Sequence, residues 1–164
     1  MYILGVDPGL AITGWGVVEA KNQRFKRIAS GVVRTKAGEN TEERIHHIAN
    51  EIGKVASNHK VAILSMEDIF FARNVSSALT VAKVIGAVIQ QLSTLSIPVR
   101  LFTPLQIKLA VTGYGNAEKN QVQEMVRLLL KLESLPRPDH VADALAAAIC
   151  LAHNLGSEKR LGGR

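Results

Sequence analysis

Two acidic residues stand where apolar, strand-like runs of the sequence end. Asp7 follows residues 2–6, and Glu67 follows the apolar run that begins at residue 61. Ligands and reacting groups collect beyond the carboxyl ends of strands in α/β sheets, so both carboxylates are candidates for chemistry. If the two strands are parallel neighbours, the carboxylates lie side by side and repel each other unless a proton or a cation intervenes. A divalent metal ion is a natural occupant of such a pair.

His140 and Asp143 offer two further potential metal ligands. They are three residues apart at the start of the last predicted helix and project from one face of it, beside its apolar stripe. With this helix against the strand ends, four ligand side chains would converge. Each also has a structural explanation: Asp7-Pro8-Gly9 is a good turn sequence, and an acidic residue favours a helix N-terminus. That second explanation is preferred for Asp139.

A sheet and several helices must position these side chains. Residues 2–6, 11–19 and 27–34 are β-branched stretches separated by turn sequences, which predicts three antiparallel strands. Residues 61–64 and 98–102 are short apolar runs with a helical pattern between them, typical of a strand–helix–strand unit with a right-handed crossover. The sequence therefore predicts an α/β fold: a five-stranded mixed sheet, three antiparallel strands then two parallel ones, flanked by helices.

Four helices are predicted from apolar periodicity, starting near residues 40, 76, 122 and 139. The helix at 76–93 is apolar almost all round, which indicates burial on more than one side. Within it Ala78, Ala82 and Gly86 recur every four residues and would let another helix approach closely. This row is a candidate subunit interface, and tight packing within one subunit explains it equally well.

Composition narrows the class of protein. The chain has 164 residues and 47% hydrophobic content, which favours one compact domain at residues 1–155 with a flexible basic tail at 156–164. No apolar run approaches the ~20 residues of a membrane span and no secretory signal is apparent, so we expect a cytoplasmic protein without a membrane partner. The single Cys150 excludes an intramolecular disulfide and a thiolate metal cluster. A net charge of +6 suggests an anionic partner such as nucleic acid, although many basic domains bind none.

Several separated motifs of the chain resemble bacterial RuvC proteins, the Holliday junction resolvases with an RNase H-like fold. The similarity runs from Ile3 to His153 and preserves the order and spacing of the family's blocks. The matching blocks are Gly5-Val6-Asp7-Pro8-Gly9, Thr13-Gly14-Trp15-Gly16, Glu67-Asp68-Ile69-Phe70, Phe71-Ala72-Arg73-Asn74 with Ser77-Ala78-Leu79, Gly113-Tyr114-Gly115-Asn116-Ala117-Glu118-Lys119 with Gln121-Val122, and Asp143-Ala144-Leu145-Ala146.

This resemblance implies a DNA endonuclease that resolves four-way junctions in recombination and repair. Asp7, Glu67, His140 and Asp143 would be the catalytic residues and would bind Mg²⁺, two ions per subunit, with water as the nucleophile. His140 stands where the better-known pattern has Asp, and it could act as ligand or as general base. An imidazole ligand suits Mn²⁺ better than Mg²⁺, so we expect Mn²⁺ to support activity and to be preferred.

The resemblance also implies the DNA contacts and the partners. Phe70 matches a base-stacking aromatic, whereas Phe71 is more simply explained as a core residue. Arg73, Lys108 and Lys119 match basic positions that contact phosphate near the cut, although solvated surface charge would also explain them. A homodimer would place one active site on each of two opposed strands, and the branch-migration proteins RuvA and RuvB would be partners.

Two alternatives belong to other classes of protein. Asp7-Pro8-Gly9 followed by Thr13-Gly14 also resembles the phosphate-binding hairpin of actin-like and sugar-kinase ATP-binding domains, but that architecture usually needs two such domains. The other alternative is a junction-binding module without catalytic activity. It would require a lost metal ligand, and all four candidate positions carry groups that bind metal.

Overall fold

A five-stranded mixed sheet forms the centre of the computed structural model, which describes residues 1–69 and 75–161. Its strands are β1 (Tyr2–Asp7), β2 (Ile12–Lys21), β3 (Arg24–Arg34), β4 (Ile63–Glu67) and β5 (Val99–Phe102). They lie in the order β3-β2-β1-β4-β5, with β1–β2 and β2–β3 antiparallel and β1–β4 and β4–β5 parallel. The predicted fold class is confirmed.

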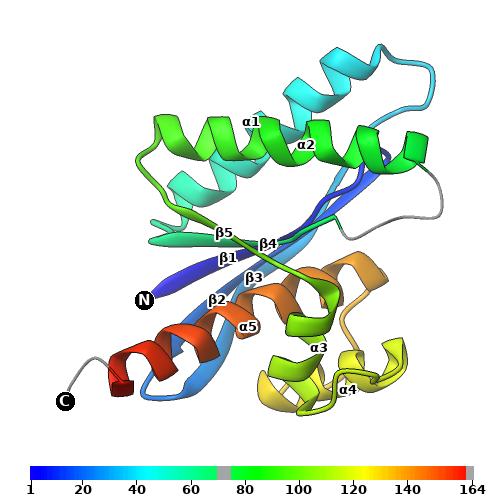
Figure 1. Cartoon of the computed structure of the whole chain (residues 1–164). Helices are drawn as coiled ribbons and strands as arrows, with labels where there is room; N and C mark the ends of the chain where they lie inside the picture. The colour runs from blue at the N-terminus through cyan, green and yellow to red at the C-terminus, as the bar shows by residue number, and fades with distance from the viewer. Residues whose placement is uncertain (70–74, 162–164) are drawn as a thin grey trace.

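Helices cover both faces of the sheet (Figure 1). On one face lie α1 (Thr41–Asn58) and α2 (Val75–Thr94), and on the other lie α3 (Pro104–Thr112), α4 (Lys119–Leu129) and α5 (Asp139–Leu161). Each layer closes its own core, because successive residues of a strand point to opposite faces. In β1, for example, Ile3 packs toward α5, whereas Leu4 packs toward α1 and α2.

The sequence analysis missed α3. Leu105 and Leu109 of this helix are more than half exposed, so no continuous apolar stripe marks it. Its signal lies at the N-terminus, where Thr103 precedes Pro104 and forms a capping box with Gln106. The Oγ1 of Thr103 accepts from the Gln106 backbone N–H at 3.3 Å, and the Gln106 Oε1 accepts from the Thr103 N–H at 2.9 Å.

The predicted burial of α2 on more than one side is wrong for the single chain. One row of this helix is buried, namely Val84, Ile85, Val88 and Leu92. Leu79 is 60% exposed and Ile89 is 37% exposed, so the opposite side is apolar and faces solvent. With a mean hydropathy of 1.4, α2 is also long and apolar enough to cross a membrane, which corrects the expectation that no segment is. Length and composition alone are weak evidence for a membrane span, because the buried row of α2 packs into the core with α1.

The last helix extends beyond the expected start of the tail at residue 156. It continues to Leu161, and residues 162–164 lie outside the described part of the chain. The Ser157 hydroxyl donates to the His153 carbonyl at 3.1 Å, and Glu158 pairs with Arg100 of β5 at 2.6 Å. The helix therefore runs through residue 155, and residues 156–161 are helical rather than a loose tail.

Candidate active site

The carboxyl ends of β1 and β4 bring two acidic residues together. In the parallel register of these strands Val6 lies opposite Met66, so Asp7 and Glu67 are the next residues along two adjacent strands. Val6 and Met66 are fully buried, whereas Asp7 and Glu67 are partly exposed at the end of the sheet. The predicted juxtaposition follows from this pairing of strands.

Helix α5 carries the remaining candidates and lies unusually close to the sheet. A Cβ atom added at Gly5 would collide with the backbone carbonyl of Ala144, and one added at Gly14 would collide with that of His140. The buried Ser65 hydroxyl of β4 also donates to the Ala147 carbonyl at 2.7 Å. These contacts set the distance between α5 and the strand ends. The small residues Ala144 and Ala147 predict such a close approach from the sequence, whereas the partners Gly5, Gly14 and Ser65 were not predicted. The signal for Ser65 was a polar residue inside an otherwise apolar strand.

His140 is hydrogen-bonded to Asp7. Its Nδ1 lies 2.6 Å from the Asp7 Oδ2, with the Asp7 side chain 20% exposed and that of His140 42% exposed. Burial raises the pKa of Asp7, the His140 hydrogen bond opposes that rise, and the negative charge of Asp143 adds to it. The net pKa of Asp7 is raised, so its ionised form depends on neighbouring positive charge.

Glu67 lies between two small cavities that together form the catalytic cleft. It shares one of about 210 Å³ with Asp7 and one of about 280 Å³ with Asp143, Lys108 and Lys119. Burial raises the pKa of Glu67 to about 7, and the charges of Asp7 and Asp143 reinforce the shift. Lys108 and Lys119 only partly offset it. Burial and the neighbouring carboxylates therefore favour the protonated form of Glu67.

Lys119, the first residue of α4, supplies positive charge to the start of α5. Its Nζ lies 3.1 Å from Asp143 and 3.6 Å from Asp139. Burial opposes the charged form of Lys119, but its bonds to these two carboxylates raise its pKa overall. Asp139 lies in the first turn of α5, as its role at the helix N-terminus requires, and also pairs with Arg137 at 2.5 Å.

The structure thus brings Asp7, Glu67, His140 and Asp143 to one cleft. There Asp7 pairs with His140, whereas Asp143 pairs with Lys119. Among the described residues no three carboxylate, imidazole or thiol groups meet as a ready metal site. The four convergent ligands predicted from the sequence would form only if Asp143 exchanged Lys119 for a metal ion. Lys108 and Lys119 line the cavity that Glu67 shares with Asp143, and their predicted contacts with phosphate stay predictions. Phe70, Phe71 and Arg73 lie outside the described residues.

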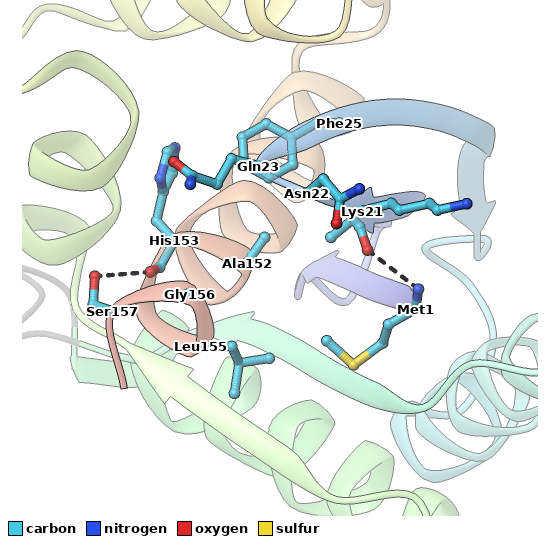
Figure 2. Close-up of a pocket in the computed structure, with 11 residues that line it drawn as sticks. Met1, Lys21, Asn22, Gln23, Phe25, Ala152, His153, Leu155, Gly156 and Ser157 are labelled. Atoms are coloured by element: carbon cyan, nitrogen blue, oxygen red, sulfur yellow. Dashed lines mark hydrogen bonds between the residues drawn. The ribbon is translucent and has the colours of Figure 1, made fainter. Parts of the chain in front are cut away.

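A separate cavity of about 370 Å³ lies at the other end of the sheet, between the β2–β3 hairpin and the last turns of α5 (Figure 2). It is lined by Met1, Phe25 and His153 among others, and the rings of Phe25 and His153 meet edge to face at 5.0 Å. No Asp or Glu lines this cavity, so it lacks the donors found beside Asp7.

The sheet order β3-β2-β1-β4-β5, with helices on both faces, defines an RNase H-like fold, and the acidic residues lie at the carboxyl ends of β1 and β4. A solved Thermus thermophilus RuvC structure is similar to this chain with a TM-score of 0.90 and 33% identity, covering 96% of this chain and 97% of that one. T. thermophilus RuvC in complex with a Holliday junction substrate is similar with a TM-score of 0.88 and 31% identity, covering 96% of both chains. The yeast mitochondrial Holliday junction resolvase Ydc2 shares the fold, with a TM-score of 0.71 and 12% identity over 96% of this chain and 82% of that one.

The sequence comparisons agree with the fold. The sequence profile of the crossover junction endodeoxyribonuclease RuvC matches residues 3–151. The RuvC protein of Clostridioides difficile is 45% identical over 98% of this chain and 95% of its own length, and that of Heliobacterium modesticaldum is 44% identical over 94% and 96%. The chain belongs to the RuvC family of crossover junction endodeoxyribonucleases, which are metal-dependent nucleases. This finding supports the resolvase reading over the ATP-binding alternative.

Proposed function

We propose that this chain resolves four-way DNA junctions by paired nicks on opposed strands, with Asp7, Glu67, His140 and Asp143 as its catalytic centre. The observation that carries the proposal is the cleft at the ends of β1 and β4, where α5 brings His140 to 2.6 Å from Asp7. The resolvase family of the chain supplies the substrate class.

The donor set of the cleft fits a divalent cation. Asp7, Glu67 and Asp143 supply carboxylates and His140 supplies an imidazole. Burial is the main cause of the raised pKa of Glu67, and the charges of Asp7 and Asp143, which a cation would offset, add to it. Asp7, Glu67, Asp143 and His140 would hold Mg²⁺, in our proposal two ions per subunit. Bound metal supplies a lowered pKa for a coordinated water and stabilises charge on the leaving oxygen.

The residues of the chain position the water and the phosphate. Asp7 orients the His140 ring through Nδ1, which leaves Nε2 to accept a proton from the attacking water or to bind metal. Lys119 and Lys108 line the same cavity as Glu67, where their charge can stabilise the phosphate during reaction. Phe70 and Arg73 are proposed DNA contacts from the family resemblance.

A homodimer would present two such centres to the two-fold symmetric junction. The row of Ala78, Ala82 and Gly86 lies on α2, where Ala78 is half-buried and Ala82 and Gly86 are exposed. Its exposed apolar surroundings, including Leu79, support the proposal that a second subunit packs here. We further propose RuvA and RuvB as partners and the cytoplasm as the location, both from the family resemblance.

A synthetic four-way junction tests the function. Wild-type protein is expected to nick it symmetrically with Mg²⁺ or Mn²⁺ and to leave it intact in EDTA. Asp7→Asn should bind the junction as wild type does but should not nick it. Tight binding by wild type without nicks in any metal would instead establish a recognition module without catalytic activity.

A further inference from the structure

The edge strand β3 and the turns at its ends form a strongly basic segment. Between Ala20 and Gly38 the sequence has six cationic residues and neither Asp nor Glu. The six, here called the basic edge, are Lys21, Arg24, Lys26, Arg27, Arg34 and Lys36. All six are exposed, and within the described part of the chain none of them pairs with a carboxylate.

The basic edge begins near the catalytic cleft and leads away from it. Arg34 lies opposite Ile12, close to where β2 pairs with Asp7, whereas Arg24 lies at the hairpin end. The 11 residues of β3 span about 33 Å at ~3.3 Å per residue, close to the ~34 Å of one turn of B-DNA. β3 has a neighbouring strand on one side only, so its outer side is open.

The hairpin end widens the basic edge. A hollow of about 530 Å³ there is lined by Lys21, Arg24 and Lys26 against one acidic residue, Glu19. Figure 2 shows the Lys21 side chain extending away from α5. Phe25 is half-buried and packs against His153, so it is not available as an anchor for a partner.

We propose that the basic edge binds the phosphate backbone of one duplex arm of the junction, over about one helical turn counted from the catalytic cleft. The cations of the basic edge form two groups, at residues 21–27 and 34–36, without an aromatic anchor. This arrangement fits phosphate contacts near the two ends of one helical turn better than a protein partner, whose interface needs a desolvated apolar centre. The inference rests on the proposed function, because the arm belongs to the same substrate.

The test compares junctions whose arms are about 20 bp with junctions whose arms are about 7 bp, shorter than one turn and closed by hairpin loops. The variant is Arg24→Gln/Lys26→Gln/Arg27→Gln. Its control, Lys54→Gln/Lys60→Gln/Lys131→Gln, removes three exposed cations elsewhere. Binding is measured over a range of salt concentrations.

On long arms the variant should lose up to about 2.7 from the slope of log K against log salt per subunit, at ~0.9 for each phosphate contact. On short arms it should bind and nick as wild type does, and the control should match wild type on both. Equal slopes for variant and control on long arms would overturn the proposal, with an acidic protein as the next partner to test. Equal losses on both arm lengths would also overturn it.

Two further results separate a failure of the proposal from an unstable variant or an inactive protein. If thermal unfolding shows the triple variant to be less stable than wild type, Lys21→Gln/Lys26→Gln at the exposed hairpin is subject to the same comparison. If wild type nicks neither junction, the proposed function fails, and the binding slopes still decide the role of the basic edge.

Discussion

The Nδ1 of His140 and the Oδ2 of Asp7 lie 2.6 Å apart, which joins the start of α5 to the end of β1 across 133 positions of sequence. When Asp7 is ionised, its carboxylate accepts a proton from Nδ1, which holds the ring in one orientation. Nε2 is then the nitrogen available for catalysis. Whether Nε2 accepts a proton or binds a metal ion can be measured.

Replacing His140 with alanine should lower the nicking rate by about 10²–10⁴-fold, the usual loss for a general base, with junction binding retained. His140→Asn is the matched variant, since its amide can donate to Asp7 but cannot carry a proton at neutral pH. Single-turnover nicking and gel-shift binding measure the two effects. Recovery of the rate by asparagine would show that His140 only positions Asp7.

Metal preference should follow the residue at position 140. With imidazole as a ligand, wild type is expected to nick faster with Mn²⁺ than with Mg²⁺, and His140→Asp should shift the ratio of rates toward Mg²⁺ because oxygen is the harder donor. Initial rates at matched metal concentrations measure the ratio. Equal wild-type rates with both metals at every pH tested would exclude a ligand role for the imidazole.

The stability of the metal-free protein should fall as the pH rises from about 4.5 to about 7. Glu67 titrates at about 7 in the folded chain against 4.5 for an ordinary glutamate. The folded state binds more protons than the unfolded state in this range, so the free energy of unfolding decreases with pH. Urea unfolding in EDTA should show this decrease in wild type, with a smaller one in Glu67→Gln. A steeper decrease in the variant would place the charged cluster elsewhere.

Gly14→Ala should cost about 1–3 kcal/mol of stability and reduce nicking, because its Cβ would meet the backbone of His140 rather than a flexible side chain. Gly38→Ala is the control, since no atom lies within 4 Å of its added Cβ. Thermal unfolding and nicking rates compare the two. A fully active Gly14→Ala protein would mean that α5 can move from the sheet without loss of function.

Gly86→Ala should affect the folding and the association of the chain in opposite directions. Its Cβ meets no atom within 4 Å in the single chain, and alanine favours a helix interior over glycine by about 1 kcal/mol. In a dimer packed through the row of Ala78, Ala82 and Gly86, the same methyl group would separate the helices. Analytical ultracentrifugation should show weaker association of a more stable chain, and unchanged association would place the interface elsewhere.

The sheet could be predicted because its strands are local patterns whose pairing follows simple rules. Two parallel runs that each end in an acid place Asp7 and Glu67 together once β1 and β4 are neighbours, and the structure has that register. His140 could be located because it stands at the start of a long apolar run with helical spacing, at residues 141–152. The order of strands and helices along the chain was therefore enough to bring several of the candidate site residues together.

What could not be predicted depends on long-range packing. The contact of Lys119 with Asp143 joins two helices that the sequence does not show to be adjacent. The side of α2 left uncovered depends on where α1 lies, which periodicity alone does not reveal. The pairing of Glu158 near the end of α5 with Arg100 joins residues 58 positions apart, which local sequence patterns do not reveal.

Helix α2 also borders the catalytic cleft, since Ala78 and Val81 line the cavity that holds Asp7 and Glu67. In the proposed dimer the same helix meets its symmetry mate, so each cleft borders the helix that packs at the two-fold axis. The helix pair then fixes the distance between the two active sites, and so the distance between the two nicks. A junction must place its two scissile strands at that distance. Substrates whose crossing strands cannot reach that separation should be bound and cut on one strand only.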